Sequence, residues 1–246
     1  MLLSKAAKDQ FVEQGFLRFP AMIGAARIKK CRERIDAALQ LDASDPTTWP
    51  EDVIAPVPQL EADMGIVATE EIDAIKRQLV GDGFVPRSSY VPVLNFPRFG
   101  AKEFNPHGFH IDGVGESTLL PVRRYLLTFV YASDVDPCGG AVAAIPGSHR
   151  QIFEHYWKTG TAPDGDTDAP DGPDYGTPIP LDGPAGTVIF LHYLLAHGSS
   201  DNRTSAIRVS LNGKTAPTTA YQRKHGAPQD NWTPMDITLR TDTLKH

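Results

Sequence analysis

Cysteine is scarce in this 246-residue chain, and long apolar runs are missing. The two cysteines, Cys31 and Cys138, cannot build a disulfide framework, and their spacing fits no zinc site. We therefore expect a reducing, cytoplasmic setting. No apolar run approaches the ~20 residues of a membrane span. Lys5 and Lys8 also interrupt the start too early for the apolar core of a signal peptide.

Positively charged residues are not in excess either. The 24 Lys and Arg residues are outnumbered by 30 Asp and Glu residues, and the formal net charge is −6. Non-specific nucleic-acid binding requires a basic face, and anionic membranes attract runs of Lys and Arg. We therefore expect neither nucleic acid nor membrane as a partner.

The residues that are present are those of an ordinary globular protein, with 41% hydrophobic and 22% charged side chains. Ser4 and Gly15 have the positions of a helix cap and a helix stop, which predicts a first helix between them. Apolar residues at helical spacing predict a second helix over 25–41. Acidic residues at its start favour a third over 69–80. The proline-rich segment 42–63 is expected to be irregular.

From residue 87 onward, short segments rich in β-branched and aromatic residues are separated by glycine and proline, which is typical of a β-sandwich or barrel. The expected strands cover 88–96, 124–132, 140–145, 186–192 and 205–212. We find no internal repeat and no linker between two cores, so a single domain is expected over 1–246. In it, helices within about 1–85 pack outside a β core of about 86–215, and a C-terminal extension covers 216–246.

Residues 160–180 contain five aspartates among glycines and prolines, and no Lys or Arg. Such a segment cannot form core. We expect a long exposed loop, with a lid over a substrate site as the alternative.

His110-Ile111-Asp112 is the first of two candidate metal-binding motifs. Side chains two residues apart on a strand point to the same side, so both can reach one metal ion. Two histidines and one carboxylate form the facial triad of non-haem iron(II) oxygenases, which leaves positions open for oxygen chemistry. A bare His-x-Asp is common by chance, and the motif requires a second histidine.

His197 supplies that histidine, and Arg208 follows on a predicted strand. An arginine in a half-buried strand is costly unless its charge is paired. Its planar guanidinium binds carboxylates bidentately, so our interpretation is a clamp for the carboxylate of a cosubstrate. The alternative is a head group that reaches solvent or a surface carboxylate. His225 and His246 are expected at the surface.

Further short motifs stand in a fixed order around these residues. The full series is Glu13-Gln14-Gly15-Phe16, His110-Ile111-Asp112, Gly139-Gly140, Ile145-Pro146-Gly147-Ser148-His149, Gly186 through Phe190, His197-Gly198-Ser199, Asn202 and Arg208. With these motifs in this order, the chain resembles the phytanoyl-CoA dioxygenase family of iron(II)- and 2-oxoglutarate-dependent oxygenases, over roughly residues 9–212.

This resemblance implies a mainly β fold, a double-stranded β-helix or jelly roll with helices outside. It makes His110, Asp112 and His197 the ligands of Fe(II), and it makes Arg208 and Ser199 the residues that bind the far carboxylate of 2-oxoglutarate. Three further residues occupy positions where relatives often contact the other end of the cosubstrate: Asn95, Thr128 and His107. For His107 two alternatives stay open: it contacts the substrate, or it supports a metal ligand. His149 and His192 are expected to be structural.

The implied reaction uses Fe(II), 2-oxoglutarate and O2, and it releases succinate and CO2 while a small-molecule metabolite or biosynthetic intermediate is hydroxylated. Desaturation, epoxidation or rearrangement would use the same oxidant. Asp112 argues against halogenation, because halogenating relatives lack this carboxylate. Two other classes stay open: a zinc hydrolase with the same ligands, in which Arg208 has no role, and a non-catalytic jelly-roll binding protein.

Overall fold

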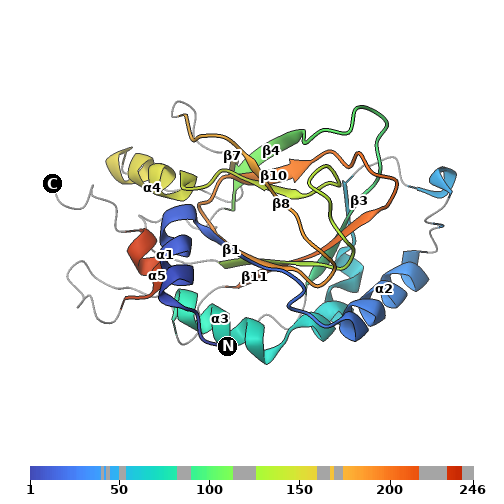
Figure 1. Cartoon of the computed structure of the whole chain (residues 1–246), viewed down its shortest axis with the longest axis horizontal. Coiled ribbons are helices and arrows are strands. Elements are labelled where there is room, and N and C mark those ends of the chain that lie inside the picture. Colours follow the sequence, from blue (N-terminus) through green and yellow to red (C-terminus); the bar gives the residue numbers. More distant parts are fainter. Residues whose placement is uncertain are drawn as a thin grey trace.

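The strands of this protein form two antiparallel sheets, one above the other in Figure 1. The computed structural model describes residues 1–39, 42, 45–49, 54–81, 90–112, 126–159, 167–168, 174–215 and 232–239. The six-stranded sheet has the order β1 (Phe16–Phe19), β9 (Val188–His192), β5 (Leu126–Tyr131), β11 (Arg208–Thr215), β3 (Val91–Asn95) and β2 (Ile54–Pro56). The five-stranded sheet has the order β7 (Thr167–Asp168), β4 (Pro106–Ile111), β10 (His197–Ser200), β6 (Val142–Ala144) and β8 (Ile179–Leu181).

Two layers of apolar side chains hold these sheets in place. Because successive side chains of a strand point to opposite faces, Leu127 and Phe129 of β5 pack between the two sheets, together with Ile189 and Leu191 of β9. The alternate residues face a second core under the helices, with Val130 as an example. This arrangement of two facing sheets confirms the predicted double-stranded β-helix.

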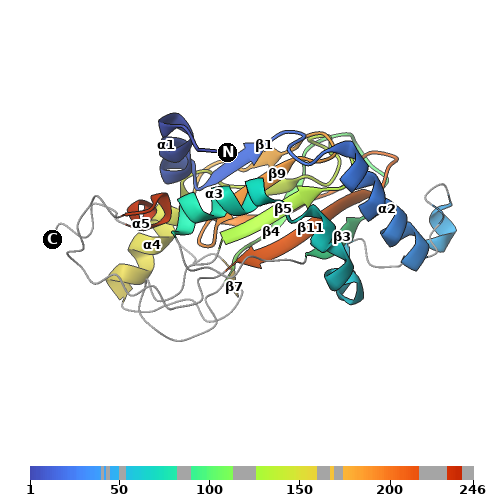
Figure 2. The same cartoon turned by 90° about the horizontal axis from the view of Figure 1, so that it is seen from below.

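Helices cover the outer face of the six-stranded sheet. They are α1 (Lys5–Gln14), α2 (Ala25–Leu39), α3 (Glu70–Val80) and the short α5 (Pro234–Thr238), with 3-10 segments η1 (Pro46–Thr48) and η2 (Pro58–Val67) between α2 and α3. Figure 2 shows α3 lying across this sheet. Its buried Ile72, Ile75 and Leu79 join the outer core. None of the helices in the described ranges is long and apolar enough to cross a membrane.

The predicted first and third helices are confirmed. The Ser4 side chain accepts a hydrogen bond from the Ala7 amide, and α1 ends at Gly15, whose φ of 83° is left-handed. Thr69 caps α3 in the same way, through the Ile72 amide. The second helix is confirmed to Leu39, and the last two residues predicted for it lie outside the described ones.

Several elements differ from the expectations. Segment 42–63 is not wholly irregular, since it holds η1, β2 and the start of η2, and Pro56 is tolerated there because β2 is an edge strand. The helical part contributes β1, which pairs with β9. The β part contains a helix, α4 (Ser148–Thr159), whose buried Ile152, Phe153 and Tyr156 have helical spacing. Most of the acidic loop over 160–180 lies outside the described residues, although β7 within it pairs with β4.

Candidate active site

Neighbouring strands of the five-stranded sheet bring the two predicted metal motifs together. In the antiparallel pair of β4 and β10, His110 lies directly opposite His197, and Ser199 lies opposite His107 after a register shift. Residues that face each other across an antiparallel pair lie on the same side of the sheet. The two imidazoles, far apart in sequence, are therefore adjacent.

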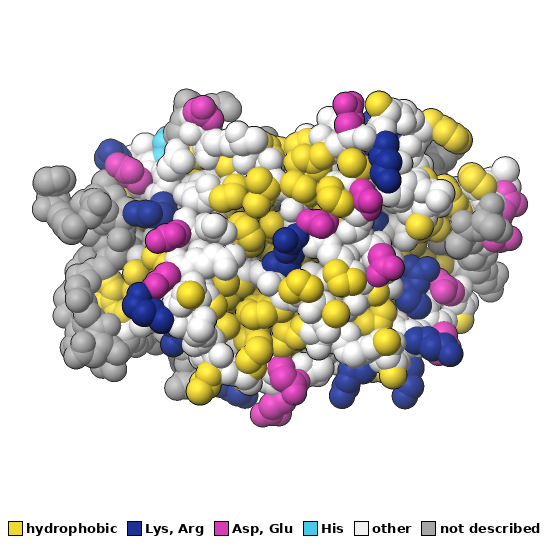
Figure 3. All heavy atoms as spheres, in the orientation of Figure 1, with side chains coloured by type: hydrophobic (Ala, Val, Ile, Leu, Met, Phe, Trp, Pro, Cys, Tyr) yellow, Lys and Arg dark blue, Asp and Glu magenta, His cyan; other side chains and the backbone are white. Residues whose placement is uncertain are grey.

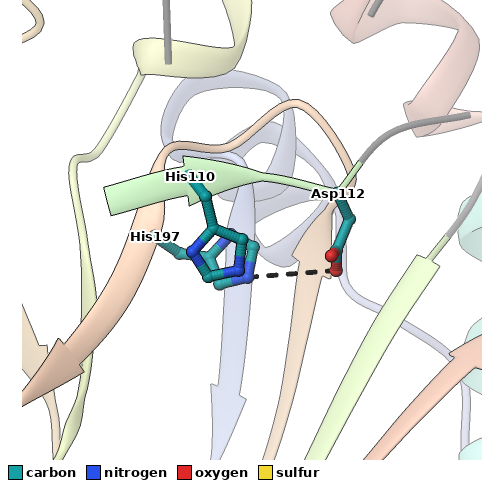
Figure 4. Close-up of side chains that lie close together, drawn as sticks. All are labelled: His110, Asp112 and His197. Atoms are coloured by element: carbon teal, nitrogen blue, oxygen red, sulfur yellow. Dashed lines mark ion pairs between the residues drawn. The ribbon is translucent and has the colours of Figure 1, made fainter. Parts of the chain in front are cut away.

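Asp112 completes the group from the residue after the end of β4 (Figure 4). The ring centroids of His110 and His197 are 4.4 Å apart. Nε2 of His197 lies 3.9 Å from Oδ2 of Asp112. One potential ligand atom from each of the three residues lies within 4.8 Å of the others. In the part of the chain that the structure describes, no other cluster of three or more His, Cys, Asp or Glu residues has this spacing.

Backbone carbonyls orient both imidazoles. Nδ1 of His110 lies 2.9 Å from the Gly108 oxygen, and Nδ1 of His197 lies 2.9 Å from the Leu195 oxygen. When Nδ1 carries the proton and donates it to a carbonyl, Nε2 keeps a lone pair for a metal. The backbone thus favours the tautomer that a ligand requires.

Burial also keeps His197 in the neutral form. Desolvation lowers the pKa of His197 from its ordinary value, and neighbouring His110 lowers it further, while Asp112 opposes the shift. Two imidazole nitrogens and a carboxylate fit Fe(II) in a facial triad. The same donors taken alone also suit zinc.

Arg208 lies at the same cavity and is almost fully buried, with 4% of its surface exposed. Its guanidinium donates to three neutral oxygens: Nε to Gly140 O at 2.8 Å, Nη1 to Val93 O at 3.3 Å and Nη2 to Ser199 Oγ at 3.4 Å. Among the described residues, no carboxylate lies within ion-pair distance of it, and burial lowers its pKa. A buried charge without a counter-charge is costly, so this residue fits a site that receives an anion.

Ser199 and Asn95 surround the guanidinium. Asn95 lies opposite Arg208 in the pairing of β3 with β11. Its Nδ2 donates to Ser200 O at 2.9 Å and to Ser199 Oγ at 3.3 Å. Asn95 is buried and does not line the cavity. The structure thus brings Arg208, Ser199 and Asn95 together, with Asn95 behind Ser199.

The structure does not bring Thr128 to the cavity. Its neighbours on β5, Leu127 and Phe129, both line the cavity. Because side chains alternate along a strand, Thr128 points to the other face of the sheet. It is fully buried there, next to the helical layer.

His107 lines the cavity from β4. Its side chain is partly exposed, and Nε2 lies 3.4 Å from Oδ1 of Asp201. Asp201 also accepts hydrogen bonds from Asn105 at 2.8 Å and from Arg203 at 2.7 Å. A fixed carboxylate therefore orients His107 at the wall of the cavity.

The cavity that these residues share has a volume of about 670 Å³, within the usual range for small-molecule sites. Its polar lining comprises the three candidate metal ligands together with His107, Ser199, Arg208, Asn212 and Lys214. Its apolar lining includes Pro56, Val91, Val93, Leu127, Phe129 and Val142. The site can thus accept a polar cosubstrate and a second, less polar molecule.

Two polar side chains of this cavity, those of Asn212 and Lys214, were not predicted from the sequence. They continue the alternation that begins at Arg208, because every second residue of β11 faces inward. The predicted strand ended at 212, whereas β11 runs to Thr215. A polar residue at every second position after Arg208 was the available signal.

Comparisons with known proteins show the family and the fold of this chain. The family model for phytanoyl-CoA dioxygenase (PhyH) matches residues 11–210. The ectoine dioxygenase of Stutzerimonas stutzeri (strain A1501) is 28% identical over 201 residues, which cover 70% of this chain and 63% of that protein. The chain therefore spans less than two thirds of the length of this curated relative.

Solved structures share the fold at low sequence identity. The epimerase SnoN, in complex with Fe3+, alpha ketoglutarate and nogalamycin RO, has a TM-score of 0.64 at 18% identity, with 94% of this chain and 92% of that chain covered. The carbocyclase SnoK from nogalamycin biosynthesis has a TM-score of 0.62 at 20% identity, with 87% and 84% covered. EctD from S. alaskensis has a TM-score of 0.61 at 22% identity, with 87% and 77% covered. Because the family model matches residues 11–210, which is most of this chain, the chain belongs to the phytanoyl-CoA dioxygenase family.

Proposed function

We propose that this protein is a non-haem Fe(II)- and 2-oxoglutarate-dependent dioxygenase that hydroxylates a small molecule and releases succinate and CO2. One observation carries the proposal: the buried Arg208, without a carboxylate partner among the described residues, lies at the same cavity as His110, Asp112 and His197. A zinc hydrolase would use the three ligands but has no role for a buried cation. A 2-oxo diacid uses both features.

His110, Asp112 and His197 would hold the metal. The carbonyls of Gly108 and Leu195 fix the two imidazoles, so that little reorganisation is needed when the ion binds. When bound, Fe(II) and 2-oxoglutarate supply the oxidising chemistry, in which O2 is consumed and the cosubstrate is decarboxylated. The task of these three side chains is to present one face of donors and leave the other face open.

Arg208 and Ser199 would bind the far carboxylate of 2-oxoglutarate. The guanidinium is already held by backbone oxygens, and a carboxylate would supply the missing counter-charge. Asn95 would act through Ser199, to which its amide donates. His107, which lies opposite Ser199, is assigned to the wall that contacts substrate.

The substrate class is a small molecule, supported by the size of the cavity and its apolar lining. Two relatives support this class: one is named an ectoine dioxygenase, and the structure of another contains nogalamycin RO. Asp112 disfavours halogenation, because the carboxylate fills the position that a halide would take. We also assign the protein to a reducing compartment such as the cytoplasm, since Cys31 and Cys138 are both free.

The test is a turnover assay with purified protein, Fe(II), 2-oxoglutarate and O2 against a panel of small metabolites. We expect substrate-stimulated succinate release and a product that has gained one oxygen atom. Products of desaturation, epoxidation or rearrangement have different masses or spectra and are distinguished in the same assay. Tightly held zinc with no succinate release under any condition would contradict the proposal and favour the hydrolase.

A further inference from the structure

Lys214, in the six-stranded sheet, contacts the candidate metal ligand Asp112, which follows a strand of the five-stranded sheet. It lies near the end of β11, where it pairs with Leu127 of β5 in the six-stranded sheet. Its Nζ lies 3.0 Å from Oδ1 of Asp112, which follows β4 in the five-stranded sheet. The contact therefore crosses the cavity, close to the two imidazoles.

The two carboxylate oxygens of Asp112 have different neighbours. Oδ1 contacts Lys214, whereas Oδ2 is the oxygen that lies 3.9 Å from Nε2 of His197. The backbone is fixed separately, because the Asp112 amide donates to Tyr193 O at 3.2 Å. Oδ1 thus lies against Lys214, and Oδ2 lies on the side of His197.

We infer that Lys214 is a positioning residue for Asp112, an inference that rests on the proposed function. By holding Oδ1, the ammonium leaves Oδ2 as the single oxygen that Asp112 offers to a metal. A carboxylate that donates one oxygen leaves more of the open face for a bidentate cosubstrate and O2. The support is well placed, because Lys214 is anchored on a strand in the middle of a sheet rather than on a loop.

This role is distinguishable from a contribution to folding. The Lys214 side chain is 44% exposed, and ion pairs that reach solvent contribute little to stability. Groups that orient a metal ligand, by contrast, typically change metal affinity or activity by 10–100-fold when removed. Loss of Lys214 should therefore affect metal binding much more than unfolding.

The test is calorimetric titration of the full chain with Mn(II), a redox-stable probe, in Lys214→Met, Lys214→Arg and wild type. We expect Lys214→Met to weaken Mn(II) binding by about 10–100-fold, and Lys214→Arg to restore it to within a few-fold. The thermal midpoint of the metal-free Lys214→Met protein should stay within about 2 °C of wild type. Lys102→Met is the matched control, because Lys102 also forms an ion pair that reaches solvent, with Asp136 at 3.7 Å, and it does not line the cavity. It should bind like wild type.

Mn(II) binding by Lys214→Met that equals wild type would overturn the inference. Tighter binding would also overturn it, because it would mean that the ammonium acts mainly by repelling the ion. Asp112→Ala is titrated in parallel as the reference for a lost ligand. If wild type and Asp112→Ala both fail to bind, the proposed metal site itself is wrong, and that outcome differs from a failure of Lys214 alone.

Discussion

Among the residues that the structure describes, two pairs of histidine rings lie close together, and the pairs differ in what surrounds them. His110 and His197 have ring centroids 4.4 Å apart with an interplanar angle of 47°. His149 and His192 are nearly the same, at 5.0 Å and 44°. The first pair adjoins Asp112 and lines a cavity, whereas the second is fully buried.

The second pair fastens the N-terminal segment to the barrel. Nε2 of His149 lies 3.2 Å from Val12 O in α1, and the His192 amide donates to Gly15 O at 2.8 Å. A Cβ on Gly15 would lie only 2.6 Å from Nδ1 of His149, so the backbone must approach closely here. Ring proximity alone therefore does not make a metal site; a carboxylate and access to a cavity are also required.

The largest expected effect comes from removing the carboxylate of Asp112, which lies beside His110 and His197 of the first pair. Asp112→Ala should abolish Fe(II)-dependent succinate release, a loss of about 10³-fold or more, because one protein ligand and its negative charge are gone. The fold should remain, since no core residue changes. Succinate assays and thermal unfolding check this, with the exposed Asp9→Ala as control. Wild-type turnover in Asp112→Ala would refute the ligand set.

Arg208→Gln tests a second feature of the surroundings of His110 and His197, the buried cation that lines the same cavity. We expect the KM for 2-oxoglutarate to rise by about 100-fold, because truncating one partner of a buried charge pair costs roughly 2–5 kcal/mol. Metal affinity should change little. An unchanged KM would show that the far carboxylate binds elsewhere.

His149→Ala breaks the second pair. The free energy of unfolding should fall by about 2–4 kcal/mol, because a buried ring and its contact with Val12 are lost. Mn(II) affinity of the folded protein should not change. Urea unfolding and calorimetry measure the two effects, with half-buried His155→Ala on the same helix as control. A loss of metal binding with unaltered stability would reverse the roles assigned to the two pairs.

The smallest expected effect is a dependence of stability on pH. Burial lowers the pKa of His149 to about 3, so this residue stays neutral in the folded protein. The unfolded chain takes up a proton below its ordinary value of about 6.5. Stability is therefore lost as the pH falls from 6.5, by about 2 kcal/mol at pH 5.

His149→Gln, which cannot titrate, should lose less stability than wild type between pH 7 and pH 5. Buried His197 contributes in the same direction in the metal-free protein, because burial lowers its pKa as well. Equal losses in wild type and His149→Gln would show that His149 is protonated in the fold.

Local patterns in the sequence predicted much of this molecule. Ser4 and Gly15 predicted the ends of α1, and the His-x-Asp spacing predicted two side chains on one side of a strand. The distance in sequence between His110 and His197 does not predict which residues of their two strands pair. The alignment of His110 with His197 depends on β4 and β10, which are far apart in sequence.

What the sequence did not predict depends on such distant pairings. Lys214 reaches Asp112 only because β11 continues past Asn212 and crosses the cavity opposite β4. Thr128 was expected to contact the cosubstrate, but it does not line the cavity, because the alternation along β5 turns Leu127 and Phe129 toward it. Helix α4 was also not predicted, although its buried Ile152, Phe153 and Tyr156 have helical spacing.

The most direct test of the central claim is an anaerobic titration with Fe(II) in the presence of 2-oxoglutarate, followed by the visible charge-transfer absorbance of the bound pair. Wild type and the folded His149→Ala should develop this absorbance at one equivalent of iron, whereas Asp112→Ala and His197→Ala should not. Absorbance that persists without Asp112 and His197, or that never forms in wild type, would contradict the assignment of this site.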